Sequence, residues 1–254
     1  MRESLPVFVI NLARDAPRRA HMEALLAKTG QPGMFVPAVD GGSLSALDQV
    51  AYDPIRALRH YGKAMRAAEI GCYLSHYRLW QRVLDERRQA ALILEDDIDI
   101  DLDLPDLITR LLACPDWLVV RLHSMRTPVL HPRTEAARGE RVAALGGGRG
   151  LYRLGTHTLG AAAYLIRAEG ARRLLAHGRR IVRPVDQTMD RFWENGIAPY
   201  VVRPFPVRQL PAFESSIGAR PPGAGEDQPA DIVLARRLER LRDSVKRRVY
   251  LLTS

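Results

Sequence analysis

Short apolar runs and amphipathic stretches alternate along most of the chain. Continuous apolar runs at residues 6–12, 34–39, 90–94 and 117–122 are typical of strands that are buried on both faces of a sheet. Between them, apolar residues recur at helical spacing after residue 15, at 64–88 and at 106–112. This alternation predicts one α/β domain whose sheet is flanked by helices.

Three consecutive carboxylates, Glu95, Asp96 and Asp97, end the apolar run at 90–94. Burying three adjacent charges costs several kcal/mol or more, so we expect them where the strand emerges, at its carboxyl end. Open α/β sheets bind ligands at that edge. Crowded carboxylate oxygens there suit a divalent cation whose shell is completed by phosphate oxygens. A solvated acidic turn is the alternative, and the triplet alone favours neither.

Polar side chains also follow the first two predicted strands. Asn11, Arg14 and Arg18 lie in a turn before a helix, where a helix N-terminus can hold a phosphate or a nucleotide edge. A solvated helix face would account for Arg18 equally well. Asp40 precedes two glycines, which allow a close approach of the backbone to a ligand. It is a candidate for binding a ribose hydroxyl, with an ordinary turn aspartate as the alternative.

The helix predicted at 64–88 carries polar residues within an apolar pattern. Glu69 and His76 are seven residues apart and therefore nearly aligned on one face. Both are candidates for the ligand site, although a buried, hydrogen-bonded structural role for His76 is favoured over a catalytic one.

Three later segments carry further expectations. The alternating residues 98–104 predict a half-exposed edge with a solvated row of aspartates, Asp99, Asp101 and Asp103. The basic, glycine-rich residues 126–150 predict a mobile loop, and such loops near a site often act as lids.

After Pro184, the four-residue spacing of Asp186, Asp190 and Glu194 predicts one acidic stripe on a helix, in which Asp186 is an N-cap or a general base.

The chain has 254 residues, a formal net charge of +9 and two cysteines. The positive charge fits anionic partners such as nucleic acid, anionic lipid or phosphate-bearing substrates. An aromatic content of 6% and the lack of an RNA-binding or helix-turn-helix signature argue against nucleic acid. No disulfide framework, signal-peptide region or membrane-spanning run is visible in the sequence, so we expect a cytoplasmic protein whose membrane contact, if any, is peripheral.

The C-terminal part of the chain predicts a separate unit. We expect a main domain at 1–218, a linker rich in proline and glycine at 219–230, and a basic amphipathic helix at 231–254. Apolar residues form one stripe of this helix, and arginines and lysines form another face over 231–252. Such a helix can lie in an anionic membrane interface, which we favour, or dock on the domain, or mediate a dimer.

Several of these motifs occur together in one known family. They are V-I-N-L at 9–12, A-V-D-G at 38–41, E-I-G-C-Y-L-S-H at 69–76, L-I-L-E-D-D at 92–97, and G-A-A-A-Y-L-I at 160–166 followed by P-V-D at 184–186. Together they resemble glycosyltransferase family 25, the lipopolysaccharide galactosyltransferase group, over about residues 5–217. The block at 69–76 followed by L-E-D-D carries most of the likeness.

The resemblance implies a GT-A-like fold, a UDP-sugar donor that is usually UDP-galactose, and inversion at the anomeric carbon. It implies a divalent metal, Mn²⁺ or alternatively Mg²⁺. Glu95 and Asp97 match the first and last acids of the metal motif, and His157 is a further candidate ligand. Inversion needs a carboxylate base, for which Asp186 is the first candidate and Asp190 the second. The candidates for donor binding are Asn11, Arg14, Arg18, Asp40, Glu69, His76, Glu95 and Asp96.

The resemblance thus favours a bacterial enzyme that transfers galactose to a lipopolysaccharide or lipid-linked glycan at the inner face of the cytoplasmic membrane. The basic segment 126–150 and the arginine-rich tail are outside the family likeness and leave the acceptor open. Three alternatives remain: a nucleic-acid-binding protein, a metal-dependent phosphohydrolase, and an inactive scaffold.

Overall fold

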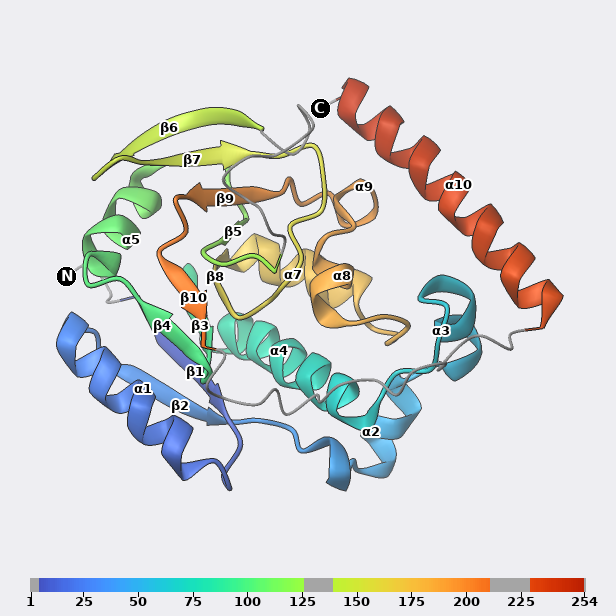
Figure 1. Ribbon diagram of the computed structural model, residues 1–254, viewed down its shortest axis with the longest axis horizontal. Helices are drawn as coiled ribbons and strands as arrows, with labels where there is room; N and C mark the ends of the chain where they lie inside the picture. Colours follow the sequence, from blue (N-terminus) through green and yellow to red (C-terminus); the bar gives the residue numbers. More distant parts are fainter. Residues whose placement is uncertain (1–4, 126–138, 211–228, 254) are drawn as a thin grey trace.

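The computed structural model describes residues 5–125, 139–210 and 229–253 (Figure 1). Its centre is an eight-stranded sheet in the order β2-β1-β3-β8-β5-β9-β7-β6. Strands β7 and β8 run opposite to the other six. In sheet order the strands are Gly33–Pro37, Val7–Asn11, Ala90–Glu95, Ala163–Arg167, Val119–Arg121, Tyr200–Arg203, Arg149–Arg153 and Glu140–Gly146. A second, two-stranded sheet pairs β4 (Ile98–Ile100) with β10 (Val207–Gln209).

Helices cover both faces of the sheet. Helices α1 (Ala16–Thr29) and α5 (Leu104–Ala113) pack on one face, where Leu26 and Leu111 join a core with Val9 and Leu94. Helices α4 (Ala67–Asp85), α7 (Ala168–His177) and α8 (Val185–Met189) pack on the other. The remaining helical segments are η1 (Gly41–Ser43), α2 (Ala46–Ala51), α3 (Pro54–His60), α9 (Phe192–Asn195) and α10 (Ala230–Thr253).

This architecture confirms the predicted α/β, GT-A-like sheet flanked by helices, with a C-terminal helix. The predicted strands are buried on both faces because their alternate side chains enter the two cores. Because β1, β2 and β3 are parallel, their carboxyl ends meet at one edge of the sheet. Asn11, Asp40 and the triplet at 95–97 therefore come together there.

Three local predictions were wrong. Residues 139–150 do not form a loop, because 140–146 and 149–153 pair as an antiparallel hairpin; residues 126–138 lie outside the described part.

The edge at 98–104 stops alternating after Ile100, and Leu102 is 67% exposed. Its aspartates are not merely solvated, since Arg149 and Arg208 form ion pairs with them. The end of the predicted main domain, from residue 211 on, and most of the linker at 219–230 lie outside the described residues.

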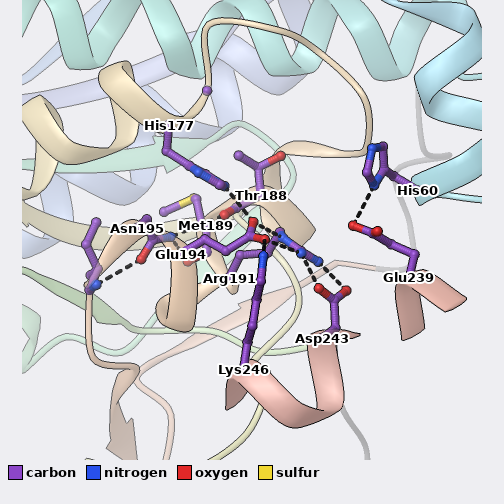
Figure 2. A network of polar contacts seen from close by, with 12 residues as sticks. His60, His177, Thr188, Met189, Arg191, Glu194, Asn195, Glu239, Asp243 and Lys246 are labelled. Carbon is purple, nitrogen blue, oxygen red and sulfur yellow. Dashed lines mark hydrogen bonds and ion pairs between the residues drawn. The ribbon is translucent and has the colours of Figure 1, made fainter. Parts of the chain in front are cut away.

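Helix α10 packs on the domain with its charged side. Asp243 accepts a hydrogen bond from Arg191 at 2.7 Å, and Glu239 forms an ion pair with His60 at 2.9 Å (Figure 2). The apolar stripe points away from the body, and Leu238 and Leu241 are 52% and 64% exposed. Within the described residues, no helix has the length and apolarity needed to cross a bilayer.

Candidate active site

A cavity of about 370 Å³ opens at the carboxyl ends of β1, β2 and β3. Its volume lies in the range of sites that bind small ligands. The first turn of α4 also borders it, through Ala67 and Ala68. The polar residues in its lining are Arg14, Arg18, Asp40, Ser75, His76, Glu95, Asp96, Asp97 and Gln209.

Two glycines allow the segment after β2 to lie directly on α4. A Cβ atom on Gly71 would be 2.5 Å from the carbonyl oxygen of Val39, and one on Gly41 would be 2.1 Å from that of Ala67. Ser75 adds a hydrogen bond, because its hydroxyl oxygen accepts from the Val39 N–H at 2.8 Å. These contacts place Asp40 at the rim of the cavity.

Asp96 turns toward β1 and α1. Its carboxylate accepts hydrogen bonds from Asn11 Nδ2 at 2.7 Å and from Arg18 Nη1 at 2.9 Å. The structure therefore brings these three predicted residues together. Since Arg18 and Asp96 are both largely buried and neutralise each other, they shape the wall of the cavity.

Asp97 keeps one carboxylate oxygen without a partner. Its Oδ2 accepts a hydrogen bond from Gln209 Nε2 at 2.9 Å, whereas the buried Oδ1 has no hydrogen-bond partner among the described residues. Burial, followed by the negative charge of Glu95, raises the pKa of Asp97 to about 6. Sequence reasoning missed Gln209, which reaches the site because β10 pairs with β4 immediately after the triplet.

Glu95 contacts residues of α4. Its Oε1 lies 3.2 Å from His76 Nε2 and 3.9 Å from Cys72 Sγ, and the ligand atoms of these three residues lie within 4.8 Å of one another. Burial raises the pKa of Glu95, but His76 outweighs burial and the net shift is downward. Burial raises the pKa of the Cys72 thiol well above its usual value.

His123 is a second residue that sequence reasoning did not assign. It is buried at the end of β5, and its Nδ1 has no hydrogen-bond partner among the described residues. Burial lowers the pKa of His123, while the charge of Glu95 opposes that shift. Its position after a buried strand was the available signal.

Arg14 and Asp40 form an ion pair at the exposed mouth of the cavity. The backbone N–H of Gly42 donates to Asp40 Oδ1 at 3.0 Å. This hydrogen bond, and then Arg14, lower the pKa of Asp40.

The two predicted base candidates differ in their surroundings. Asp186 is half-buried, accepts hydrogen bonds from the N–H groups of Gly160 and Gln187, and raises the pKa of Cys72 by its charge. Asp190 is 3% exposed, and its Oδ2 accepts from the N–H groups of Thr158 and Leu159. Asp190 thus fixes the backbone at 158–159, and neither aspartate is among the residues that line the cavity.

Two other candidates lie away from the cavity. Glu69 accepts a hydrogen bond from the Arg66 backbone N–H at 2.7 Å and one from Tyr61, so it stabilises the start of α4. His157 packs edge-on against Trp193, with ring centroids 5.4 Å apart, and lines a different cavity. The structure therefore does not bring His157 to Glu95 and Asp97. The predicted stripe from Asp186 to Glu194 also breaks, because α8 ends at residue 189 and α9 starts at 192.

The residues at the triplet fit a divalent cation. Hard oxygen ligands suit Mg²⁺ and Mn²⁺, and the unpartnered Oδ1 of Asp97 lies in the same acid cluster as Glu95. Two carboxylates whose charges oppose each other's ionisation would both be stabilised by a cation between them. No described hydrogen bond of Asp97 would have to break for that oxygen to bind a metal.

Comparison with known proteins identifies the family of the chain. Residues 4–189 match the family described as Glycosyltransferase family 25 (LPS biosynthesis protein). The chain belongs to this family. It is 29% identical over 220 residues to procollagen galactosyltransferase 1 of Danio rerio. The alignment covers 82% of this chain and 35% of that protein.

Other family 25 relatives differ in their described activity. The chain is 30% identical over 215 residues to the inactive glycosyltransferase 25 family member 3 of Homo sapiens, covering 82% of this chain and 35% of that protein. It is 45% identical over 100 residues to a glycosyltransferase 25 family member of Drosophila pseudoobscura pseudoobscura. This alignment covers 37% of this chain and 16% of that protein. The chain spans about a third of the length of the first two relatives.

Proposed function

We propose that this family 25 chain is an active, inverting glycosyltransferase that moves galactose from UDP-galactose to a glycan acceptor. The observation that carries this proposal is the unpartnered, buried Oδ1 of Asp97 beside Glu95, in a cavity at the carboxyl edge of the sheet. The procollagen galactosyltransferase relative supports the choice of sugar. A lipopolysaccharide or lipid-linked acceptor in a bacterial cytoplasm remains part of the proposal.

Glu95 and Asp97 would hold a divalent metal, Mn²⁺ or Mg²⁺. When bound, the metal would supply Lewis-acid stabilisation of the charge that develops on the leaving diphosphate. His76 holds Glu95 in place, and Gln209 holds Asp97. Arg14, which pairs with Asp40, places a guanidinium at the mouth of the cavity, where an anionic donor would enter.

Asp186 is the base in this proposal. Both of its oxygens accept a backbone hydrogen bond, which orients the carboxylate and leaves lone pairs available for the proton of an acceptor hydroxyl. Asp190 instead positions the backbone beside Gly160. Arg121 connects Asp190 to Gly160, because it pairs with the Asp190 carboxylate at 3.5 Å and donates a hydrogen bond to the Gly160 carbonyl oxygen. Removing the Asp190 carboxylate would disturb Asp186 indirectly.

The test compares Asp97→Asn with Asp99→Asn, an aspartate two residues on that pairs with Arg208 at the surface. We expect Asp97→Asn to lower UDP release from UDP-galactose and acceptor by at least about a hundredfold, a typical loss for an electrostatic catalytic group. It should also weaken Mn²⁺ binding measured by calorimetry, whereas Asp99→Asn should change neither. Full activity of Asp97→Asn would refute the proposal, and release of inorganic phosphate instead of UDP would indicate a phosphohydrolase.

The outward face of α10 is our proposed contact with an anionic membrane surface. Its stripe of exposed apolar side chains comprises Leu234, Leu238, Leu241, Val245, Val249 and Leu252. Exposed arginines flank the stripe, while Glu239 and Asp243 point to the body of the protein. A second copy of this helix would therefore meet mainly like charges, whereas anionic lipid complements both the apolar stripe and the arginines.

Flotation with vesicles tests this contact. The wild-type chain should float with vesicles that contain phosphatidylserine and remain unbound with neutral phosphatidylcholine. Leu238→Gln combined with Leu241→Gln should abolish flotation, whereas Leu47→Gln combined with Val50→Gln, on the exposed side of α2, should not. Equal flotation of both double variants, or a wild-type dimer by light scattering that the α10 variant loses, would overturn the proposal.

A further inference from the structure

A second cavity, of about 450 Å³, lies between α3, the α8–α9 segment and α10. Six of its lining residues are lysine or arginine: Lys63, Arg183, Arg191, Arg236, Arg240 and Arg247. The one carboxylate among the lining residues belongs to Asp243, which already pairs with Arg191 (Figure 2). Such a concentration of positive charge favours an anionic ligand.

Arg183 gives an independent indication of an anion-binding site. It is only 8% exposed and forms no hydrogen bond or ion pair with any residue that the structure describes. Burial, followed by the neighbouring Arg191, lowers the pKa of Arg183 to about 10, while the charges of Asp243, Glu194 and Glu239 oppose that shift, so the guanidinium is still charged at neutral pH. A largely buried guanidinium that makes no hydrogen bond is costly, and an anion in the cavity would offset that cost.

Trp193 contributes a second unused donor. Its Nε1 atom is buried and has no hydrogen-bond partner among the described residues, although the residue lines the cavity. An indole N–H can only donate, so it needs an acceptor atom. Arg183 and Trp193 come from different segments, and both lack an acceptor at the same cavity.

We propose that this cavity binds a phosphate or pyrophosphate group that the sugar acceptor carries. Several guanidinium groups suit such an anion, because each can donate two parallel hydrogen bonds to phosphate oxygens. The cavity adjoins the proposed base, since Gln187 in its lining directly follows Asp186. The link to the acceptor rests on the proposed glycosyltransferase function, whereas the binding of the anion does not.

Calorimetry with inorganic pyrophosphate tests the anion site on the full chain, with EDTA present to exclude metal-dependent binding at the triplet. Arg240→Gln combined with Arg247→Gln should weaken pyrophosphate binding about tenfold or more, as expected for lost charged hydrogen bonds. Arg242→Gln combined with Arg248→Gln removes the same charge from α10 outside the cavity and should change the affinity less than about twofold. Equal weakening in both variants, or no binding by the wild type, would overturn the proposal.

Arg183→Met separates binding from a structural role. Without ligand its Tm should equal or exceed that of the wild type, because the substitution removes a largely buried charge that makes no hydrogen bond and lies beside Arg191. The rise of Tm with pyrophosphate should disappear. A lower Tm with unchanged pyrophosphate affinity would show that Arg183 is structural and would refute the site.

UDP with Mn²⁺ distinguishes this inference from the proposed function, since UDP would bind at the first cavity. Its affinity should be the same in the wild type and in the variant lacking Arg240 and Arg247. A wild type that binds pyrophosphate but not UDP would contradict the proposed function and leave the anion site intact.

Two further ligands distinguish between a phosphate on a soluble glycan and a phosphate on a lipid. Binding of glucose 1-phosphate that depends on Arg240 and Arg247 would support a phosphate on a soluble glycan. Vesicles that contain phosphatidic acid are tested with the chain that also carries Leu238→Gln and Leu241→Gln. Binding to these vesicles that depends on Arg240 and Arg247 would support a lipid-borne phosphate. Failure of both ligands would refute the acceptor's phosphate as the occupant.

Discussion

His76 connects Glu95 to the core, because its Nε2 lies 3.2 Å from Glu95 Oε1 and its Nδ1 lies 2.9 Å from the hydroxyl of Tyr164. Trp80 donates its indole N–H to the same hydroxyl oxygen at 2.9 Å. A carboxylate only accepts, so Nε2 carries a proton and donates it to Glu95, while Nδ1 shares a hydrogen bond with the Tyr164 hydroxyl. The buried tyrosine thus fixes the ring of the histidine that orients a proposed metal ligand.

Tyr164→Phe should therefore destabilise the protein. It leaves the Trp80 N–H and His76 Nδ1 buried without partners, which typically costs about 1–3 kcal/mol per group. Urea denaturation measures the free energy of unfolding. Tyr77→Phe is the matched control, because the Tyr77 hydroxyl is only partly buried and donates to Leu175 at a longer 3.4 Å. Equal losses in the two variants would contradict the relay through Tyr164.

Much of the fold and part of the site followed from local patterns. Apolar runs marked β1 and β3. The polar residues at the ends of these strands, Asn11 and Glu95, came together because parallel strands share an edge. The pair of Asp97 and Gln209 had no such signal, since the two residues are 112 positions apart and meet only through the β4–β10 pairing.

Other expectations failed because tertiary contacts override local periodicity. His157 follows a strand, yet the segment at 156–160 turns its ring toward Trp193. The orientation of α10 was not predicted, because its amphipathic pattern left open a membrane contact, docking on the domain and a dimer. Ion pairs of Glu239 and Asp243 with His60 and Arg191 orient the helix, and no local pattern reports those partners.

Asp190→Asn should change how stability depends on pH. Burial raises the pKa of Asp190 to about 6 from 3.8, so the folded state holds this proton more tightly than the unfolded state. The stability from that proton is complete below about pH 4 and is lost as pH rises through 6. The linked free energy is on the order of 3 kcal/mol. The unfolding free energy of the wild type minus that of the variant should therefore fall between pH 4 and pH 7; a constant difference would contradict this assignment.

Glu194→Gln should act in the opposite pH direction. Burial raises the pKa of Glu194, but hydrogen bonds from Arg191 outweigh burial and bring it to about 2, below 4.5. The resulting stability is present above pH 4.5 and is lost as pH falls toward 2. The variant should lose on the order of 2 kcal/mol at pH 7 and show a shallower acid transition. Glu169→Gln, which removes an exposed partner of Arg172 and Arg173, should cost less than about 1 kcal/mol.

Gly71→Ala should separate the segment after β2 from α4. The new Cβ would be 2.5 Å from the Val39 carbonyl oxygen and 2.8 Å from the Gly41 nitrogen, so the backbone that carries Asp40 would have to move. Overpacking of this kind costs about 1–3 kcal/mol, and affinity for UDP should fall with stability. Gly42→Ala is the control, since its Cβ would meet only Asp40 at 3.4 Å or more. Calorimetric titration of UDP with Mn²⁺ should show weaker binding for Gly71→Ala alone. Unchanged affinity would mean that the position of Asp40 does not matter for the donor.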